Sequence, residues 1–135
     1  MLALACLLLA SCDVLFESKD LSVVAYTGPD ISREQVAEGW SGQVNGNRVV
    51  LKSPVSLVEP NKTMFITLID RSDALPKLED VWIGRVNGPG RTLRKARVEI
   101  QEWHLTGVVS GAFEIARPTG VKIYERFWID LSSLP

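Results

Sequence analysis

The sequence contains few of the residues from which metal sites and covalent cross-links are built. It has one histidine, His104, and two cysteines, Cys6 and Cys12, both within the first 12 of its 135 residues. A closed structural zinc site takes four cysteine or histidine ligands, and a disulfide takes two cysteines. Residues 13–135 provide neither, so the fold must be stabilised by apolar packing.

Neither sign of charge is in excess, and the usual catalytic patterns are missing. The 15 basic and 16 acidic residues give a net charge of −1, which provides no overall attraction to nucleic acid. No glycine-rich loop joins a strand to a helix, and the spacing from Gly107 to Gly111 differs from the serine-hydrolase pattern G-x-S-x-G. We therefore expect no catalytic residue, no metal, no cofactor and no nucleic-acid partner.

The long run without charge lies at residues 1–11. At 1.5 Å per residue, a helix of this length crosses about half of the roughly 30 Å hydrocarbon core of a bilayer. The run is therefore too short for a transmembrane helix and has the size of the apolar part of a signal peptide. No lysine or arginine precedes it. The positive segment of a signal peptide is thus reduced to the terminal amine, or the true start lies upstream of Met1.

The run ends in Leu9-Ala10-Ser11-Cys12, which resembles the lipobox of bacterial lipoprotein signal peptides. The resemblance implies that residues 1–11 are removed, that Cys12 carries a diacylglyceryl group, and that residues 12–20 form a short tether. Two or three acyl chains bind a membrane durably, whereas one does so marginally. Asp13 resembles the residue that keeps such proteins in the inner membrane of enteric bacteria. We expect a protein exported from the cytoplasm and anchored by lipid in the bacterial envelope, with the choice of membrane left open.

Residues 21–135 have the pattern of one β-domain. Residues 108–115 and 121–131 alternate with a period of two, which is typical of strands. Asn45-Gly46, between expected strands at 40–44 and 47–52, favours a two-residue type I′ hairpin turn. Further strands are expected over residues 21–26, 64–69, 81–86 and 97–105. The pattern predicts an all-β fold with seven to eight strands, packed as an antiparallel β-sandwich or a small barrel.

Helical signals are confined to one short segment. Ser32 and Gln35 fit a capping box, and Gly39 lies where a helix C-cap would be. We therefore expect at most one short helix, near residues 33–38.

Two segments of the β-domain resemble a group of uncharacterised bacterial lipoproteins. In that group a "vnG" turn precedes a β-domain that ends in an "I-x-I … vSGtF" hairpin. The matching residues are Asn45, Gly46, Val98, Ile100, Val109, Ser110, Gly111 and Phe113, with Ala112 in place of the usual threonine. Since the group has no established activity, the resemblance implies an antiparallel β fold and leaves the function open.

Basic residues gather around Asn87-Gly88-Pro89-Gly90, between two expected strands. They are Arg85, Arg91, Arg94, Lys95 and Arg97. Arg91, Arg94 and Arg97 form a candidate binding patch for an anionic membrane surface or an acidic envelope protein, and the alternative is a solubilising surface. We expect all three to lie on one exposed hairpin, where charge reversal leaves folding intact.

The tryptophans are interpreted as packing residues, with a sugar-binding platform as the alternative. They are Trp40, Trp82, Trp103 and Trp128.

Three classes of function fit these observations. We favour a non-catalytic, membrane-anchored module that binds an envelope protein or serves an envelope assembly, in an oligomeric state that the sequence leaves open. The second is an envelope inhibitor of a lysozyme-like hydrolase, because Ser110-Gly111 resembles the serine-glycine loop of lipoprotein lysozyme inhibitors. The third is a small hydrolase, whose candidate carboxylates are Asp70, Asp73, Glu79 and Asp80.

Metabolic labelling tests the lipid anchor. Cells that express the chain should incorporate labelled palmitate into it, and Cys12→Ser should abolish labelling and leave an unprocessed precursor, because the acylated thiol is lost. Cys6→Ser, within the segment to be removed, should keep both labelling and processing. Unchanged labelling of the Cys12→Ser protein would rule out this anchor.

Overall fold

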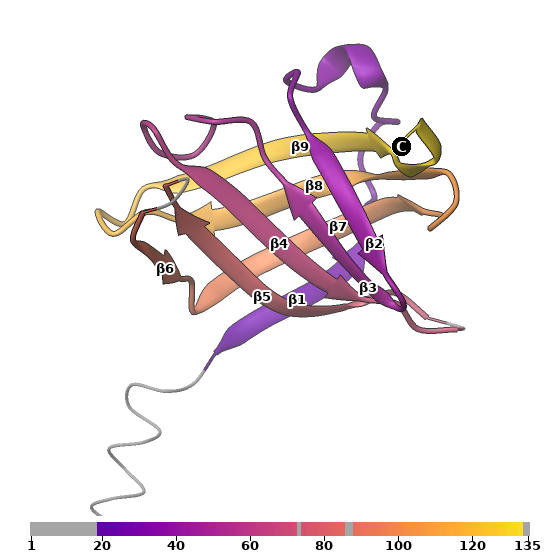
Figure 1. Cartoon of the computed structure of the whole chain (residues 1–135), viewed down its shortest axis with the longest axis horizontal. Coiled ribbons are helices and arrows are strands. Elements are labelled where there is room, and N and C mark those ends of the chain that lie inside the picture. The colour runs from indigo at the N-terminus through magenta and orange to yellow at the C-terminus, as the bar shows by residue number, and fades with distance from the viewer. Residues whose placement is uncertain (1–18, 73, 86–87, 134–135) are drawn as a thin grey trace, which may run out of the picture.

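Two β-sheets packed face to face make up the fold (Figure 1). The computed structural model describes residues 19–72, 74–85 and 88–133. The expected signal peptide, Cys12 and most of the tether lie outside the described residues, as do Asp73 and Asn87. Within the described part there are nine strands and two short 3₁₀ turns.

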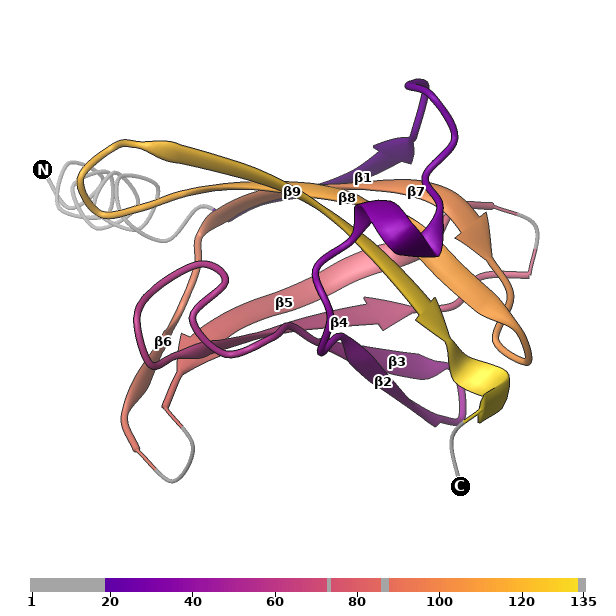
Figure 2. The ribbon, with the colours of Figure 1, turned by 90° about the horizontal axis from the view of Figure 1, so that it is seen from above.

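The strands are β1 (Asp20–Ala25), β2 (Ser41–Asn45), β3 (Arg48–Lys52), β4 (Thr63–Ile69), β5 (Lys77–Gly84), β6 (Gly90–Thr92), β7 (Lys95–Trp103), β8 (Val108–Ala116) and β9 (Lys122–Asp130). The 3₁₀ turns are η1 (Arg33–Gln35) and η2 (Leu131–Ser133). One sheet has the order β1-β7-β8-β9 and the other the order β2-β3-β4-β5-β6. No described strand of one sheet is hydrogen-bonded to the other, so the architecture is a sandwich (Figure 2).

The all-β prediction is confirmed, with differences in detail. Strand β6 was missed because its three residues are too few to show a period. Strand β5 begins at Lys77, four residues before the strand expected over residues 81–86. The expected helix is the three-residue turn η1. Strand β1 runs parallel to β7, whereas the other strand pairs are antiparallel.

The hairpin between β2 and β3 is present, but its turn is shifted by one residue. Asn45 pairs with Arg48, so the two turn residues are Gly46 and Asn47. Gly46 has a φ of +66°, and Asn47 is not among the residues with positive φ. This combination is typical of a type II′ turn, which needs glycine at its first central position, and the predicted type I′ turn is wrong.

The core lies between the two sheets. Along each strand every second side chain faces inward and contributes to it. In β4 the alternation is regular, with Met64, Ile66 and Leu68 almost fully buried. Phe113 and Phe127 are the largest fully buried side chains of the opposite sheet. Burial of each such side chain contributes about 1.5–3 kcal/mol, and this layer replaces the missing disulfides as the source of stability.

A bulge in β7 lies opposite Ser110 and Gly111 of β8 and accounts for the small residues at these two positions. The register between β7 and β8 shifts between Ile100 and Glu102, opposite Gly111 and Ser110. A Cβ atom on Gly111 would lie 1.8 Å from the carbonyl oxygen of Glu99, so only glycine fits there. Ser110 is fully buried, donates to Glu102 at 3.2 Å and accepts from the Gln101 amide at 3.0 Å.

Gly111→Ala should destabilise the domain by about 3 kcal/mol, because a backbone carbonyl cannot move aside as a side chain can. Gly107→Ala is the matched control, since a Cβ atom there meets only the Cβ of His104 at 3.5 Å, an ordinary contact. Urea unfolding followed by tryptophan fluorescence measures both variants. Equal stability of the two would contradict the close approach at Gly111.

Candidate functional site

One end of the sandwich gathers the segments in which the basic residues lie. We call it the β1 end, because β1 begins there, and it comprises residues 19–20, 59–62, 85, 88–97 and 114–122. Asp20 pairs with Lys95 and Ala116 pairs with Lys122 in one sheet, and Gly84 pairs with Gly90 in the other. Both views place these strand ends on the same side of the molecule (Figures 1 and 2).

The β1 end is strongly positive, although the chain as a whole is nearly neutral. Its basic residues are Lys19, Lys62, Arg85, Arg91, Arg94, Lys95, Arg97, Arg117 and Lys122. Its acidic residues are Asp20, Glu59 and Glu114. In the rest of the described chain, ten acidic residues face six basic ones. The domain therefore has a positive end and a negative remainder.

The three arginines predicted as one patch do not lie on one hairpin. Arg91 lies in β6, at the edge of the five-stranded sheet, and Arg97 lies in β7 of the other sheet. The chain crosses between the sheets at residues 93–94. The predicted single basic hairpin is therefore wrong, because β5 pairs with β6 and not with β7.

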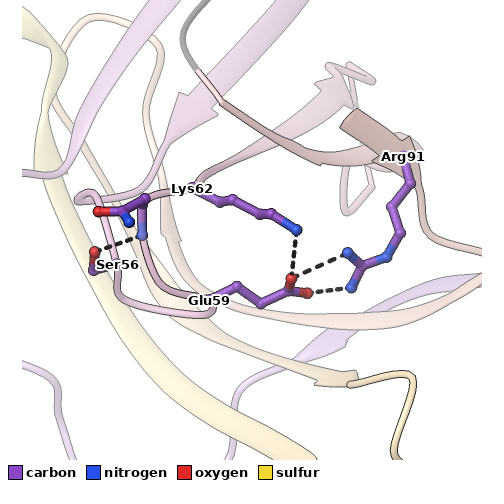
Figure 3. Close-up of polar contacts among 5 residues, drawn as sticks. Ser56, Glu59, Lys62 and Arg91 are labelled. Carbon is purple, nitrogen blue, oxygen red and sulfur yellow. Dashed lines mark hydrogen bonds and ion pairs between the residues drawn. The ribbon is translucent and has the colours of Figure 1, made fainter. Parts of the chain in front are cut away.

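Arg91 is held by a carboxylate from the connection between β3 and β4 (Figure 3). Its guanidinium donates to both oxygens of Glu59, Nη1 to Oε1 at 3.1 Å and Nη2 to Oε2, and Lys62 Nζ donates to Oε1 at 3.1 Å. The Glu59 side chain is only 14% exposed. The hydrogen bond from Arg91, and to a smaller extent that from Lys62, lowers the pKa of Glu59 to about 2 against the opposing effect of burial. The same bond raises the pKa of Arg91.

The backbone of this connection is shaped to present Glu59. Ser56 and Asn61 both have positive φ angles, of 69° and 61°. The Asn61 N–H donates to Ser56 Oγ at 2.9 Å, which closes the turn around Glu59 (Figure 3). Arg91 therefore has a structural role as well as a charge, since it fastens the edge strand β6 to this turn.

Arg97 is also paired, on the outer face of the other sheet. Its Nη2 lies 3.4 Å from Glu99 and 2.9 Å from Glu114, and Lys122 lies 3.3 Å from Glu114. These side chains are more exposed, at 47% for Arg97 and 73% for Lys122. Reversal of all three predicted arginines would therefore disturb folding at Arg91, contrary to the expectation from sequence.

Glu59, Lys62 and Arg91 form what we call the Glu59 cluster, and a hollow of about 410 Å³ lies beside it. Lys62, Arg85 and Arg91 line it, together with Ile83, Pro89 and Gly90. Three basic residues line the hollow, and the one carboxylate that pairs with two of them, Glu59, leaves it with a net positive charge. Such a charge suits a phosphate group, for which arginine is a preferred partner.

Two of the carboxylates proposed for a hydrolase, Asp70 and Glu79, have structural partners of their own, and Asp73 lies outside the described residues. Asp70 accepts a hydrogen bond from Trp103 Nε1 at 2.6 Å, and Glu79 pairs with Arg48 at 3.1 Å. His104 is exposed in the turn between β7 and β8. Within the described ranges there is no cluster of three or more His, Cys, Asp or Glu side chains suited to a metal.

The tryptophans have packing partners, in keeping with their interpretation from sequence. Trp40 contacts Phe113 and Phe127, with ring centroids 5.8 and 5.7 Å away. Trp82 lies 5.5 Å from Phe65 and covers two glycines of the outer face of its sheet. Trp128 lies under the guanidinium of Arg33.

Comparison with models of known protein families, with curated proteins and with solved structures finds no match for this chain. Across residues 19–72, 74–85 and 88–133, no helix is long and apolar enough to cross a membrane.

Removal of the Glu59 charge tests the cluster. Glu59→Gln should lower the free energy of unfolding at pH 7 by about 2 kcal/mol, because two half-buried cations lose a charged acceptor. Glu79→Gln, whose partner Arg48 is 54% exposed, should cost less than about 1 kcal/mol. Urea unfolding gives both values.

The difference in unfolding free energy between the wild type and Glu59→Gln is predicted to depend on pH. The pKa of Glu59 is about 2 in the folded state and has an ordinary value of 4.5. Its stabilisation is therefore complete above pH 4.5 and is lost as the pH falls through 2. The difference between the wild type and Glu59→Gln should shrink over that range, and a difference that is constant with pH would contradict the ion pair.

Proposed function

We propose that the chain is a lipid-anchored protein of the bacterial envelope whose β-domain is a non-catalytic binding or assembly module. The observation that supports this most is the position of the β1 end. Strand β1 begins eight residues after Cys12, the proposed site of acylation. Eight extended residues span at most about 28 Å, so an acylated Cys12 keeps this basic end near the bilayer.

Charge gives this end a preferred orientation. Each lysine or arginine near an anionic leaflet contributes about 1 kcal/mol of attraction. Arg85, Arg94, Lys95 and Arg117 are exposed, and the hollow beside Arg91 suits a lipid phosphate. We infer that the β1 end faces the lipid and that the rest of the domain, with its excess of carboxylates, faces away from it.

The other two classes of function have less support. Ser110 and Gly111 lie in the buried middle of β8, so they do not form the exposed loop that an inhibitor resemblance implies. The candidate carboxylates Asp70 and Glu79 have separate structural partners. A binding or assembly role needs neither an exposed serine-glycine loop nor a pair of carboxylates.

Vesicle experiments test the orientation. The full acylated chain, labelled with a fluorophore through Thr119→Cys at the β1 end or Asn47→Cys at the opposite end, is reconstituted in phosphatidylcholine with or without phosphatidylglycerol. A quencher on the lipid headgroups should quench the label at position 119 in anionic vesicles and leave the label at position 47 bright. High salt should weaken the effect, since the attraction is electrostatic.

Charge reversal supplies the matched control. Reversal of Arg85, Lys95 and Arg117 to glutamate should remove the difference between the two labels. Reversal of Arg48, Arg71 and Lys77, away from the β1 end, should preserve it. Equal quenching of both labels in the unmodified chain would overturn the proposed orientation.

A further inference from the structure

A second hollow lies on the part of the domain that the proposed orientation turns away from the lipid. It has a volume of about 880 Å³ and runs between residues 33–41 and the last residues of β9. Figures 1 and 2 show the segment that contains η1 rising beside β9. A volume of this size holds a short stretch of peptide.

One wall of this groove is the edge of a sheet. In the described sheet order, β9 has β8 as a hydrogen-bonded neighbour and no strand on its other side. Residues 128–130, at the end of β9, line the groove. An edge strand presents unpaired N–H and C=O groups along its open side, which an extended segment of another chain can pair with.

The groove also has aromatic walls, and a cation of the protein itself rests on one of them. The Arg33 guanidinium lies 5.8 Å from the ring centroid of Trp128. Arg33 is exposed, and a cation–π contact at an exposed site is weak, so another cation can displace it. Trp40 forms a second wall of the groove, and its ring is fixed by its packing on Phe113 and Phe127.

The charge of the groove favours a basic ligand. Glu34, Glu38 and Asp130 line it together with Arg33. The segment that carries Arg33, Glu34 and Glu38 is held to β7, because the Gln101 side chain accepts from Ile31 N at 2.7 Å and donates to Ile31 O at 3.1 Å. A groove anchored in this way needs little ordering before it binds.

We propose that the groove binds an extended basic segment of an envelope protein. The backbone of this segment adds to the open edge of β9 at residues 128–130, and one of its lysine or arginine side chains takes the place of Arg33 on Trp128. Glu34 and Glu38 neutralise its charge. The inference rests on the proposed binding role and names the chemistry of the partner.

Titration with defined probes tests the ligand class. The full acylated chain in phosphatidylcholine nanodiscs, at low salt, is titrated by calorimetry with three compounds: a capped Lys-Val-Lys-Val-Lys peptide, its glutamate counterpart, and a trimer of N-acetylglucosamine. The basic peptide should bind and the other two should not. Binding of the acidic peptide or of the sugar in its place, or no binding of the basic peptide at millimolar concentration, would overturn the proposal.

Variants separate this groove from general charge attraction. Trp128→Ala, and Glu34→Gln combined with Glu38→Gln, should each weaken binding about tenfold, which corresponds to about 1.4 kcal/mol. Arg33→Ala should strengthen binding several-fold, because it removes the internal competitor. Arg71→Ala removes the same charge elsewhere and should change binding little, and an equal gain in both arginine variants would refute the displacement of Arg33.

Hydrogen exchange supplies a readout that charge alone does not change. The bound basic peptide should slow exchange of amides at residues 128–130 and leave those at residues 122–124, at the start of the same strand, as they were. Unchanged exchange at residues 128–130 would contradict strand addition. These assays contain no anionic lipid, so their failure is distinct from a failure of the vesicle experiment.

Discussion

The parallel pairing of β1 with β7 decides which end of the domain lies beside the tether. Because the two strands run in the same direction, both begin at the same end, and the Asp20 N–H donates to the Arg94 carbonyl at 2.7 Å. An antiparallel β1 would start at the opposite end. The proximity of the basic residues to the proposed anchor, and the distance of the groove at the end of β9 from it, both follow from this one pairing.

The basic residues of the β1 end divide into two groups with different physical roles. Arg91 is bound to the carboxylate of Glu59, which is 14% exposed, so its charge is largely neutralised within the protein. Arg85 and Arg117 are exposed on turns, where charge costs little stability and acts on the surroundings. The position of an arginine in the sequence does not tell which group it belongs to, because its pairing depends on residues far away in the chain, such as Glu59 for Arg91.

The all-β class and most strands could be predicted because period-two alternation is a local signal. Strand direction, sheet membership and the length of β6 could not, because alternation carries no information about partners. The Glu59–Arg91 pair joins residues 32 apart, and the groove joins residues 33–41 to residues 128–130. A single sequence marks neither contact. From sequence, Trp128 and Trp40 are interpreted as packing residues, with a sugar-binding platform as the alternative, and not as walls of a peptide groove.

Two edge strands, β6 of the five-stranded sheet and β9 of the four-stranded sheet, differ in a way that bears on association between copies of the chain. Copies held by the proposed lipid anchor would share a thin layer, so their effective concentration would be high and open strand edges would invite association between copies. Strand β6 has three residues and carries the locked Arg91, which leaves few backbone groups for a neighbouring copy. The nine-residue β9 is longer and offers more backbone groups, and the segment at residues 33–41 lies beside its far end, so a neighbouring copy can reach that edge only alongside this segment.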